Sequence, residues 1–266
     1  MNTIIIIPAR YASTRFPGKP LVKINGASGR SVTLLQRSWE VAKTVNDAQR
    51  VVIATDDIRI RNHAESFGAE VIMTSENCQN GTERCAEALD HLKDEYDLVI
   101  NFQGDAPLTP SWFVTDLINA LKENRGFTVA TPALKCDIGM IEDLLKDRKN
   151  SLVGGTTVVF NKDKSALYFS KEVIPFVPLD LLKQKEVAVY HHVGVYAYRV
   201  DVLKDYISWK TGKLELAEGL EQLRFLENNK QILCVESESM GQKFWELNNP
   251  EDLEKIEQFL SKMGIA

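Results

Sequence analysis

The sequence has few cysteines and no long apolar run. Its four cysteines (Cys78, Cys85, Cys136 and Cys234) lack the spacing of a metal site, and no histidine stands where it could complete one. We therefore expect reduced thiols that fill the core. No segment approaches the roughly 18 apolar residues of a membrane span. The start, Met1-Asn2-Thr3, lacks the charged region of a signal peptide. These absences favour a cytoplasmic protein without membrane insertion.

The sequence also lacks an excess of positive charge. Its net charge is −5, so no global basic field is available to bind nucleic acid. With 44% apolar and 26% charged residues, the 266 residues are typical of one large globular domain. A local cluster of cations in such an acidic chain therefore points to a small anionic ligand.

The hydrophobic pattern of the first half alternates between strand and helix. Strands are predicted at residues 3–7, 50–54, 70–73 and 97–102. The helices predicted between and after them cover residues 31–45, 57–67, 81–92 and 110–121. This alternation predicts an α/β fold whose mainly parallel sheet is covered on both faces.

After about residue 125 the alternation loosens. Strands are predicted at residues 127–133, 155–160, 191–198, 231–235 and 243–247. Helices are predicted at residues 138–145, 202–209, 216–226 and 250–260. No repeat or linker divides the chain. We therefore expect a single domain over residues 1–266, with an inserted lobe at roughly 175–230.

A cationic loop follows the first strand. Arg10, Arg15 and Lys19 lie within ten residues, and Gly18 allows a sharp turn between Pro17 and Lys19. Open α/β sheets bind ligands at the carboxyl ends of their strands. Fixed cations there suit a polyphosphate, whose charge grows on the bridging oxygen as diphosphate leaves. A solvated surface loop is the alternative.

Asp105 stands just beyond the predicted strand 97–102. A carboxylate at a strand end can bind Mg²⁺, which prefers oxygen ligands and often uses one or two carboxylates together with phosphates. Gly104 and Pro107 flank it, so a turn aspartate that caps its own backbone is equally compatible with the pattern.

Several segments together carry a family resemblance. The chain resembles the sugar-acid cytidylyltransferases, and most closely the 3-deoxy-manno-octulosonate (Kdo) cytidylyltransferases. The resemblance spans nearly the whole chain, in the family's order. The matching segments are the loop from Pro8 to Leu21, Ala54-Thr55-Asp56-Asp57, Gly81-Thr82-Glu83-Arg84, Gln103-Gly104-Asp105, Ala166-Leu167-Tyr168-Phe169-Ser170, His192-Val193-Gly194-Val195-Tyr196, Leu220-Glu221-Gln222-Leu223-Arg224 and Pro250-Glu251-Asp252-Leu253.

This resemblance implies a Rossmann-like, three-layer nucleotidyltransferase fold, a homodimer formed through the inserted lobe, and transfer of CMP from CTP to a sugar acid for surface polysaccharide synthesis. The implied CTP-binding residues are Ala9, Arg10, Arg15, Lys19, Met73 and Ser75. The implied acceptor-binding residues are Arg84, Gln103, His192, Tyr196, Glu221 and Gln222. Mg²⁺ is expected at Asp105, with Arg10 and Lys19 acting beside it in catalysis.

The chain departs from the family at a few positions. Asn248 replaces an aspartate that binds metal in the family, and we hypothesise that Glu246, alone or with Asn248, supplies the missing carboxylate. Lys171 replaces an arginine and so lacks its bidentate fork, and Thr157 replaces a lysine. Residues 25–31 form a longer connection than the family's glycine-proline start of the first helix.

The departures concern the acceptor more than the reaction. The favoured hypothesis is CMP transfer to Kdo. The alternatives are the same reaction on an amino-Kdo, another ulosonic acid or a phosphonate, and a nucleotide-binding protein that has lost catalysis. The intact set of Arg10, Arg15, Lys19 and Asp105 argues against the last.

Overall fold

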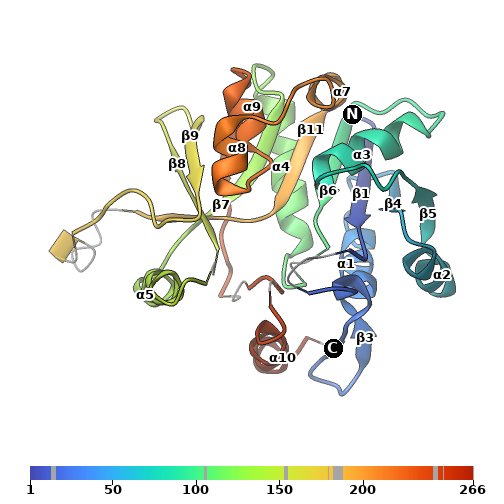
Figure 1. Cartoon of the computed structure of the whole chain (residues 1–266), viewed down its shortest axis with the longest axis horizontal. Coiled ribbons are helices and arrows are strands. Elements are labelled where there is room, and N and C mark those ends of the chain that lie inside the picture. The colour runs from blue at the N-terminus through green and yellow to red at the C-terminus, as the bar shows by residue number, and fades with distance from the viewer. Residues whose placement is uncertain are drawn as a thin grey trace.

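The structure is a computed structural model (Figure 1). It describes residues 1–12, 16–104, 107–152, 155–178, 180–181, 188–241, 245–247 and 249–265. Its main feature is a ten-stranded mixed sheet in the order β5-β4-β1-β6-β11-β7-β10-β8-β9, with β12 paired to β7.

One half of the sheet is parallel. It comprises β1 (Thr3–Ala9), β4 (Arg50–Thr55), β5 (Glu70–Met73) and β6 (Leu98–Phe102), paired in register along their lengths. Side chains of β1 alternate between the faces, so that Ile4 and Ile6 enter one core cluster and Ile5 and Ile7 the other. All four isoleucines are fully buried, as expected of a parallel strand covered on both sides.

The other half is mixed. β11 (Val195–Arg199) runs antiparallel to β6 and to β7 (Val129–Lys135), whereas β12 (Ile232–Glu236) runs parallel to β7. Beyond β7 follow β10 (Tyr190–His192), β8 (Thr156–Phe160) and β9 (Ala166–Ser170), all antiparallel to their neighbours.

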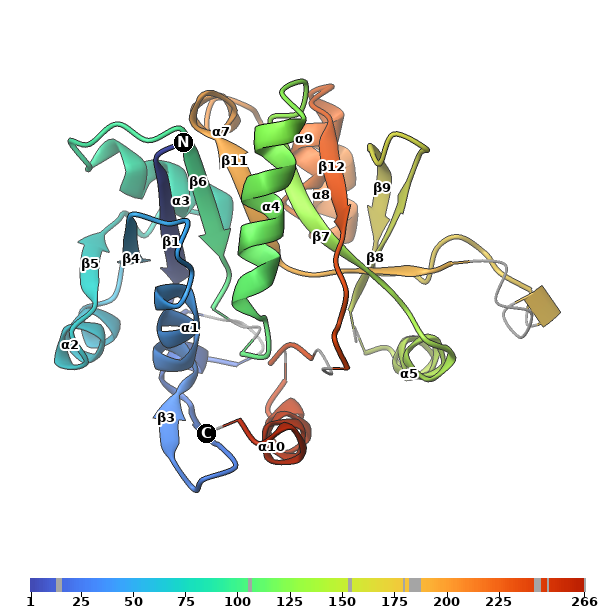
Figure 2. The same cartoon turned by 180° about the vertical axis from the view of Figure 1, so that it is seen from behind.

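Helices cover both faces and create three layers (Figures 1 and 2). The face with Ile5 and Ile7 packs against α1 (Leu34–Lys43), α2 (Ile58–Ser66) and α4 (Ser111–Glu123). The opposite face packs against α3 (Gly81–Asp90), α7 (Val200–Tyr206) and α9 (Leu223–Glu227), beside which lies α8 (Lys213–Glu218). None of the described helices is both long and apolar enough to cross a bilayer.

Smaller elements close one end of the domain. The 3₁₀ turn η1 (Lys19–Leu21) leads into a hairpin of β2 (Lys23–Asn25) and β3 (Ser31–Thr33). α10 (Asp252–Met263) packs on this hairpin through Ile24, Ile256 and Leu260, and α5 (Ile138–Lys149) covers a separate small cluster.

Two of the predicted elements begin or divide elsewhere. The helix predicted from residue 31 starts at Leu34, because Ser31–Thr33 pair with β2 and the Thr33 hydroxyl caps the helix by accepting from Gln36 N. The strand predicted at 191–198 is split into β10 and β11 at Val193 and Gly194, where the Thr131 hydroxyl donates to the Val193 and Val195 carbonyls.

Two further predictions were wrong for reasons of backbone geometry. The helix predicted at 216–226 is two short helices, because Gly219 ends α8 with a φ of 61°. Leu216 consequently lies outside the expected apolar stripe and is 72% exposed. Residues 245–247 are not in a strand, and residues 243 and 244 of the same prediction lie outside the described residues. The remaining predicted elements are present, displaced by a few residues at their ends.

Candidate active site

A cavity of about 600 Å³ opens at the carboxyl ends of β1 and β6. Its lining comes from segments far apart in the chain. They are the segments after β1, β6 and β9, the starts of α1, α3 and β8, the segments around β10, β11 and α8–α9, and Glu246. A ligand site at this position is what open α/β sheets favour. The lining includes ten residues of the sequence predictions, namely Ala9, Arg10, Lys19, Arg84, Gln103, His192, Tyr196, Glu221, Gln222 and Glu246.

The first wall is cationic. Arg10 is exposed and donates a long hydrogen bond of 3.5 Å to the Gln79 carbonyl, while Lys19 begins η1. Gly18 has a φ of 73°, and its N–H donates to the Tyr11 carbonyl at 3.0 Å. That bond joins the two ends of the predicted phosphate loop. Arg15 falls in its middle and lies outside the described residues.

The start of α3 forms the floor beside that wall. Asn80 caps the helix, and a Cβ on Gly81 would lie 3.3 Å from the Pro8 ring, so glycine permits the close approach of α3 to β1. The N–H groups of this helix start are already used within the protein, since Glu83 N donates to the Asn80 side chain and Thr82 N to the Glu221 carboxylate, both at 2.9 Å.

Arg84 of α3 also belongs to this floor. Its guanidinium lies 3.3 Å from an Asp56 oxygen and donates to the Thr74 hydroxyl and the Ser75 carbonyl. Only 2% of Arg84 is exposed. Its role in acceptor binding stays a prediction, since much of its bonding capacity serves the floor itself.

The opposite wall is polar and largely buried. Glu221 lies between α8 and α9, and its carboxylate accepts from the Thr82 N–H at 2.9 Å and from the Gln103 amide nitrogen. The Gln103 oxygen is consequently directed toward Gly194, where an added Cβ would lie 3.1 Å from it. The amide thus presents a hydrogen-bond acceptor to the cavity.

Two buried polar atoms of this wall have no hydrogen-bond partner among the described residues. They are His192 Nε2 and Gln222 Nε2, on side chains that are 4% and 2% exposed. A buried unpaired nitrogen is costly, so a ligand hydroxyl or water is its natural partner. Burial lowers the pKa of His192 to about 3, which keeps the imidazole neutral.

Tyr196 and His192 were predicted to share a face of one strand. They lie instead in β11 and β10, on either side of the break at Val193 and Gly194, with ring centroids 5.3 Å apart. Burial raises the pKa of Tyr196 well above its usual value, so the phenol stays protonated. Both side chains line the cavity.

Oxygen donors for a metal ion also reach the cavity. Glu246 lines it, and one Glu246 oxygen lies 3.9 Å from the Cβ position on Gly194, near the Gln103 oxygen. Asp105 and Asn248, the other predicted ligands, lie outside the described residues. Within the described part of the chain, no group of three His, Cys, Asp or Glu side chains is arranged to hold a metal.

Two predicted CTP residues do not line the cavity. Met73 ends β5, and Ser75 donates its N–H to Glu87 at 2.5 Å. Glu87 also accepts from the Cys78 thiol at 3.0 Å, so it fixes the segment between β5 and α3. Contact of Met73 or Ser75 with a base stays a prediction.

The departures from the family lie in different surroundings. Lys171 lines the cavity, with its Nζ 2.9 Å from a Cβ position on Gly219. Thr157 does not, because its hydroxyl donates to the Glu172 carbonyl at 2.7 Å and accepts from Ile174 N at 3.1 Å. Thr157 therefore holds the chain after β9, and Thr156 faces the cavity in its place.

Sequence reasoning missed several lining residues. Gly194 lies inside a quoted motif but was not singled out, although a glycine within a strand pattern signals a bulge. Asn80 and Glu83 are recognisable as a capping pair, three residues apart at a helix start. Glu215 gave no local signal, because its importance comes from a contact with Arg224 nine residues away.

Comparison with known proteins gives the family. A family model described as cytidylyltransferase matches residues 4–232. A Maricaulis maris protein named 3-deoxy-manno-octulosonate cytidylyltransferase is 41% identical over 265 residues, which cover 99% of each chain. A Parabacteroides distasonis protein of the same name is 39% identical, covering 98% of this chain and 99% of its own.

A solved structure supports the same conclusion. It is a CMP:2-keto-3-deoxy-manno-octonic acid synthetase complexed with CTP, with a TM-score of 0.82 and 31% identity, covering 99% of this chain and all of its own. The α/β nucleotidyltransferase fold and the near-complete overlap with these relatives lead to one conclusion. The chain belongs to the 3-deoxy-manno-octulosonate cytidylyltransferase family.

Proposed function

We propose that the protein transfers CMP from CTP to Kdo and forms CMP-Kdo and diphosphate. The observation that supports this most is one cavity that joins a cationic wall to a wall with unpaired, buried hydrogen-bonding groups. The first suits a triphosphate and the second a ligand rich in hydroxyls. The names of the relatives and the CTP complex of the similar structure agree with both substrates.

The reaction needs positioning and charge neutralisation more than covalent chemistry by the protein. The anomeric hydroxyl of the acceptor loses its proton to water as its oxygen bonds to the α-phosphorus, and the bond from that phosphorus to the α–β bridging oxygen breaks. Arg10 and Lys19 balance the charge that develops on the leaving diphosphate. Arg15 is expected to add to them on the family resemblance.

The acceptor is expected to lie against the polar wall. Glu221 and the Gln103 oxygen accept hydrogen bonds from hydroxyls, whereas the neutral His192 and the Gln222 amide supply the unpaired nitrogens. Lys171 offers a positive charge to the acceptor carboxylate without the fork of an arginine. A looser grip on the carboxylate is the observation that keeps other sugar acids among the alternative acceptors.

Mg²⁺ is the proposed cofactor. The donor chemistry fits, because Glu246 brings a carboxylate oxygen into the cavity beside the Gln103 oxygen. Glu246 would hold the ion with Asp105 and Asn248, and the ion would supply positive charge to the phosphates. We expect Glu246→Gln to weaken Mg²⁺ binding about tenfold, measured as the Mg²⁺ dependence of CTP binding by calorimetry. Unchanged Mg²⁺ dependence would exclude Glu246 as a ligand.

The assembly and cellular setting are proposed on the resemblance. We infer a homodimer formed through the lobe at roughly 175–230, where Phe176 is 90% exposed on a segment that leaves the body of the sheet (Figure 2). Light scattering would give twice the 30.0 kDa of one chain, and Phe176→Asp would reduce it. Cytoplasmic location and a role in lipopolysaccharide or other surface polysaccharide synthesis complete the proposal.

The test of the activity is diphosphate release from CTP and Mg²⁺, with Kdo beside 8-amino-Kdo, other ulosonic acids and phosphonates. Release with Kdo is the expected result. Release only with another acid would mean that this acid, and not Kdo, is the acceptor of the same reaction. CTP binding without release for any acceptor would favour a nucleotide-binding protein that has lost catalysis.

A further inference from the structure

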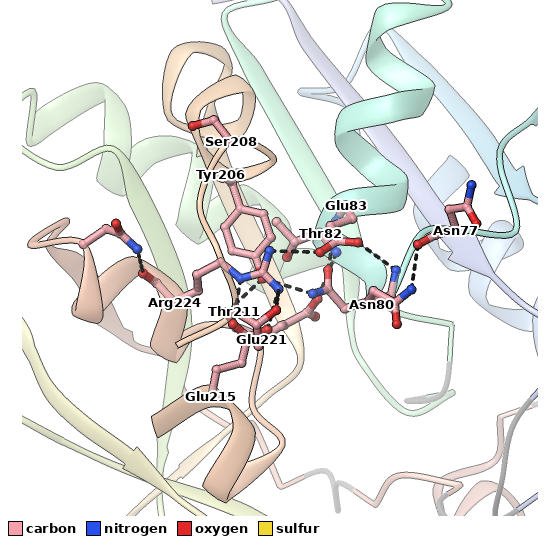
Figure 3. A network of polar contacts seen from close by, with 12 residues as sticks. Asn77, Asn80, Thr82, Glu83, Tyr206, Ser208, Thr211, Glu215, Glu221 and Arg224 are labelled. Atoms are coloured by element: carbon pink, nitrogen blue, oxygen red, sulfur yellow. Dashed lines mark hydrogen bonds and ion pairs between the residues drawn. The ribbon is translucent and has the colours of Figure 1, made fainter. Parts of the chain in front are cut away.

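A buried arginine in the lining of the cavity joins three helices. Arg224 of α9 binds Glu215 of α8 with two hydrogen bonds of 2.6 and 2.7 Å, and its remaining arm donates to Glu83 of α3 at 2.9 Å (Figure 3). Arg224 is 2% exposed and Glu215 is 7% exposed. The guanidinium also lies 4.3 Å from the ring centroid of Tyr206. We call Arg224, Glu215 and Glu83 the charged clasp.

The clasp is part of a larger network around Glu221. Thr82, next to Glu83 in the first turn of α3, donates its N–H to the Glu221 carboxylate. The Tyr206 hydroxyl donates to the Glu221 carbonyl at 3.1 Å. Figure 3 shows Glu221 between Arg224 and the start of α3. The position of Glu221 therefore depends on how the segment from α8 to α9 sits on α3.

That segment has little intrinsic rigidity. α8 has six residues and α9 five, which is too short for either to be stable alone. Gly219 breaks the helical path between them. Long-range contacts must therefore fix the turn that carries Glu221 and Gln222, and the clasp supplies charged ones from both sides of that turn.

Stability alone is a weak explanation of the clasp. A buried ion pair often contributes no more to stability than apolar residues of the same volume would, because both charges lose their hydration. What such a pair adds is direction, since the arginine fork accepts only a narrow range of geometries. Here the pair orients the part of the polar wall in which Gln103 donates to Glu221.

We propose that Arg224 is a positioning residue for the acceptor: with Glu215 and Glu83, it fixes Glu221 so that the Gln103 amide keeps its oxygen toward the cavity. The proposal rests on the proposed function, since it assigns the acceptor to this wall. If Glu221 shifts, the Gln103 nitrogen loses its partner and the amide can rotate.

Arg10 and Lys19 of the cationic wall lie on other elements. Arg10 is linked to the clasp through Gln79, whose carbonyl accepts from Arg10 and whose N–H donates to a Glu83 oxygen at 2.7 Å. Glutamine at position 83 retains an oxygen for that N–H, so Glu83→Gln should leave the cationic wall in place.

The test uses two variants and a matched control. Arg224→Lys keeps the charge and removes the fork, and Glu83→Gln removes one charge and leaves the Arg224–Glu215 pair intact. The control is Lys230→Met, which breaks the exposed Lys230–Asp205 pair next to the same helices. Diphosphate release gives the KM for the acceptor, and calorimetry without acceptor gives the Kd for CTP.

We expect both clasp variants to raise the acceptor KM about tenfold and to change the Kd for CTP by less than about twofold. Lys230→Met should leave both constants unchanged. Acceptor KM values at the wild-type level, or a parallel loss of CTP affinity, would overturn the positioning role alone. A wild-type protein that releases no diphosphate with any acid would overturn the proposed function and this proposal with it. If Arg224→Lys does not fold, the acceptor KM and the Kd for CTP of Glu83→Gln test the proposal.

Discussion

The two walls of the cavity hold their charges in different ways. Arg10 of the cationic wall is exposed, and the backbone bond from Gly18 to Tyr11 sets its surroundings. Arg224 of the polar wall also lines the cavity, but it is buried and fixed by side chains from α8 and α3. On the proposed function, we expect the first wall to bind the flexible triphosphate, and we expect the second to provide the fixed geometry that selects the sugar acid. Changes in charge should therefore damage the first wall most, and changes in shape the second.

The largest effect is expected on the cationic wall. Lys19→Met should lower kcat/KM for CTP about 100-fold or more, because one positive charge near the leaving diphosphate is lost. The control is Lys23→Met, which removes an exposed lysine of β2 that does not line the cavity. Steady-state kinetics at low and high ionic strength would compare them. Equal losses in both variants would mean that general charge, and not this position, matters.

Two buried histidines, His192 of the polar wall and its neighbour His191, should make stability depend on pH. Burial lowers the pKa of His191 to about 4 and that of His192 to about 3, both below the ordinary value of 6.5. Below pH 6.5 the unfolded chain binds protons that the native state does not, so stability falls as pH falls through this window. Each histidine should cost about 2 kcal/mol between pH 6.5 and 5.

Urea unfolding at pH 7 and pH 5 measures this loss. His191→Gln should reduce it by the share of one histidine, whereas His91→Gln, at an exposed position, should leave it unchanged. The same loss in the His191 variant as in the wild type would mean that the buried imidazole is not the cause.

Adding one methyl group at Gly194 should impair acceptor binding and leave CTP binding intact. The added Cβ of Gly194→Ala would lie 3.1 Å from the Gln103 oxygen, and that amide cannot yield easily because Glu221 holds it. We expect the acceptor KM to rise about tenfold and the Kd for CTP to stay unchanged. Gly126→Ala is the control, because nothing lies within 4 Å of its added Cβ. A normal acceptor KM for Gly194→Ala would show that the wall adapts.

The smallest effect concerns two helix ends. Gly68 and Gly219 both have positive φ, 85° and 61°, so alanine at either position should cost about 1 kcal/mol of stability. Only Gly219→Ala also crowds a cavity residue, Lys171, at 2.9 Å. The two variants should therefore have similar melting temperatures in thermal unfolding, and only Gly219→Ala should weaken acceptor binding. A kinetic effect of Gly68→Ala would contradict this division.

The sequence predicted the parallel half of the fold well, because its signals are local. A short, β-branched apolar run such as Ile4 to Ile7 favours a buried strand, and Asp57 and Asn80 mark helix starts by accepting from nearby N–H groups. The cationic loop after β1 was found for the same reason: its cations, prolines and glycine are neighbours in sequence.

The antiparallel half was predicted less well, because its signals are long-range. Nothing near Gly194 indicates that Thr131 will bond to the carbonyls around it, and so β10 and β11 were taken as one strand. The same holds for Leu216–Leu226, whose apolar spacing suggested one helix although Gly219 divides it. Thr157 was expected near the acceptor and instead holds the chain after β9.

The sequence by itself therefore determined the α/β class, the family, the cationic loop and ten of the residues that line the cavity. These follow from local periodicity and from motifs whose order is visible along the chain. Only the tertiary structure decided that Glu221 is fastened to both Thr82 and Gln103, and that Arg224 is shared between Glu215 and Glu83. The physical reason is that a buried charge takes its partners from whatever elements fold around it, and here those partners are up to 141 residues apart.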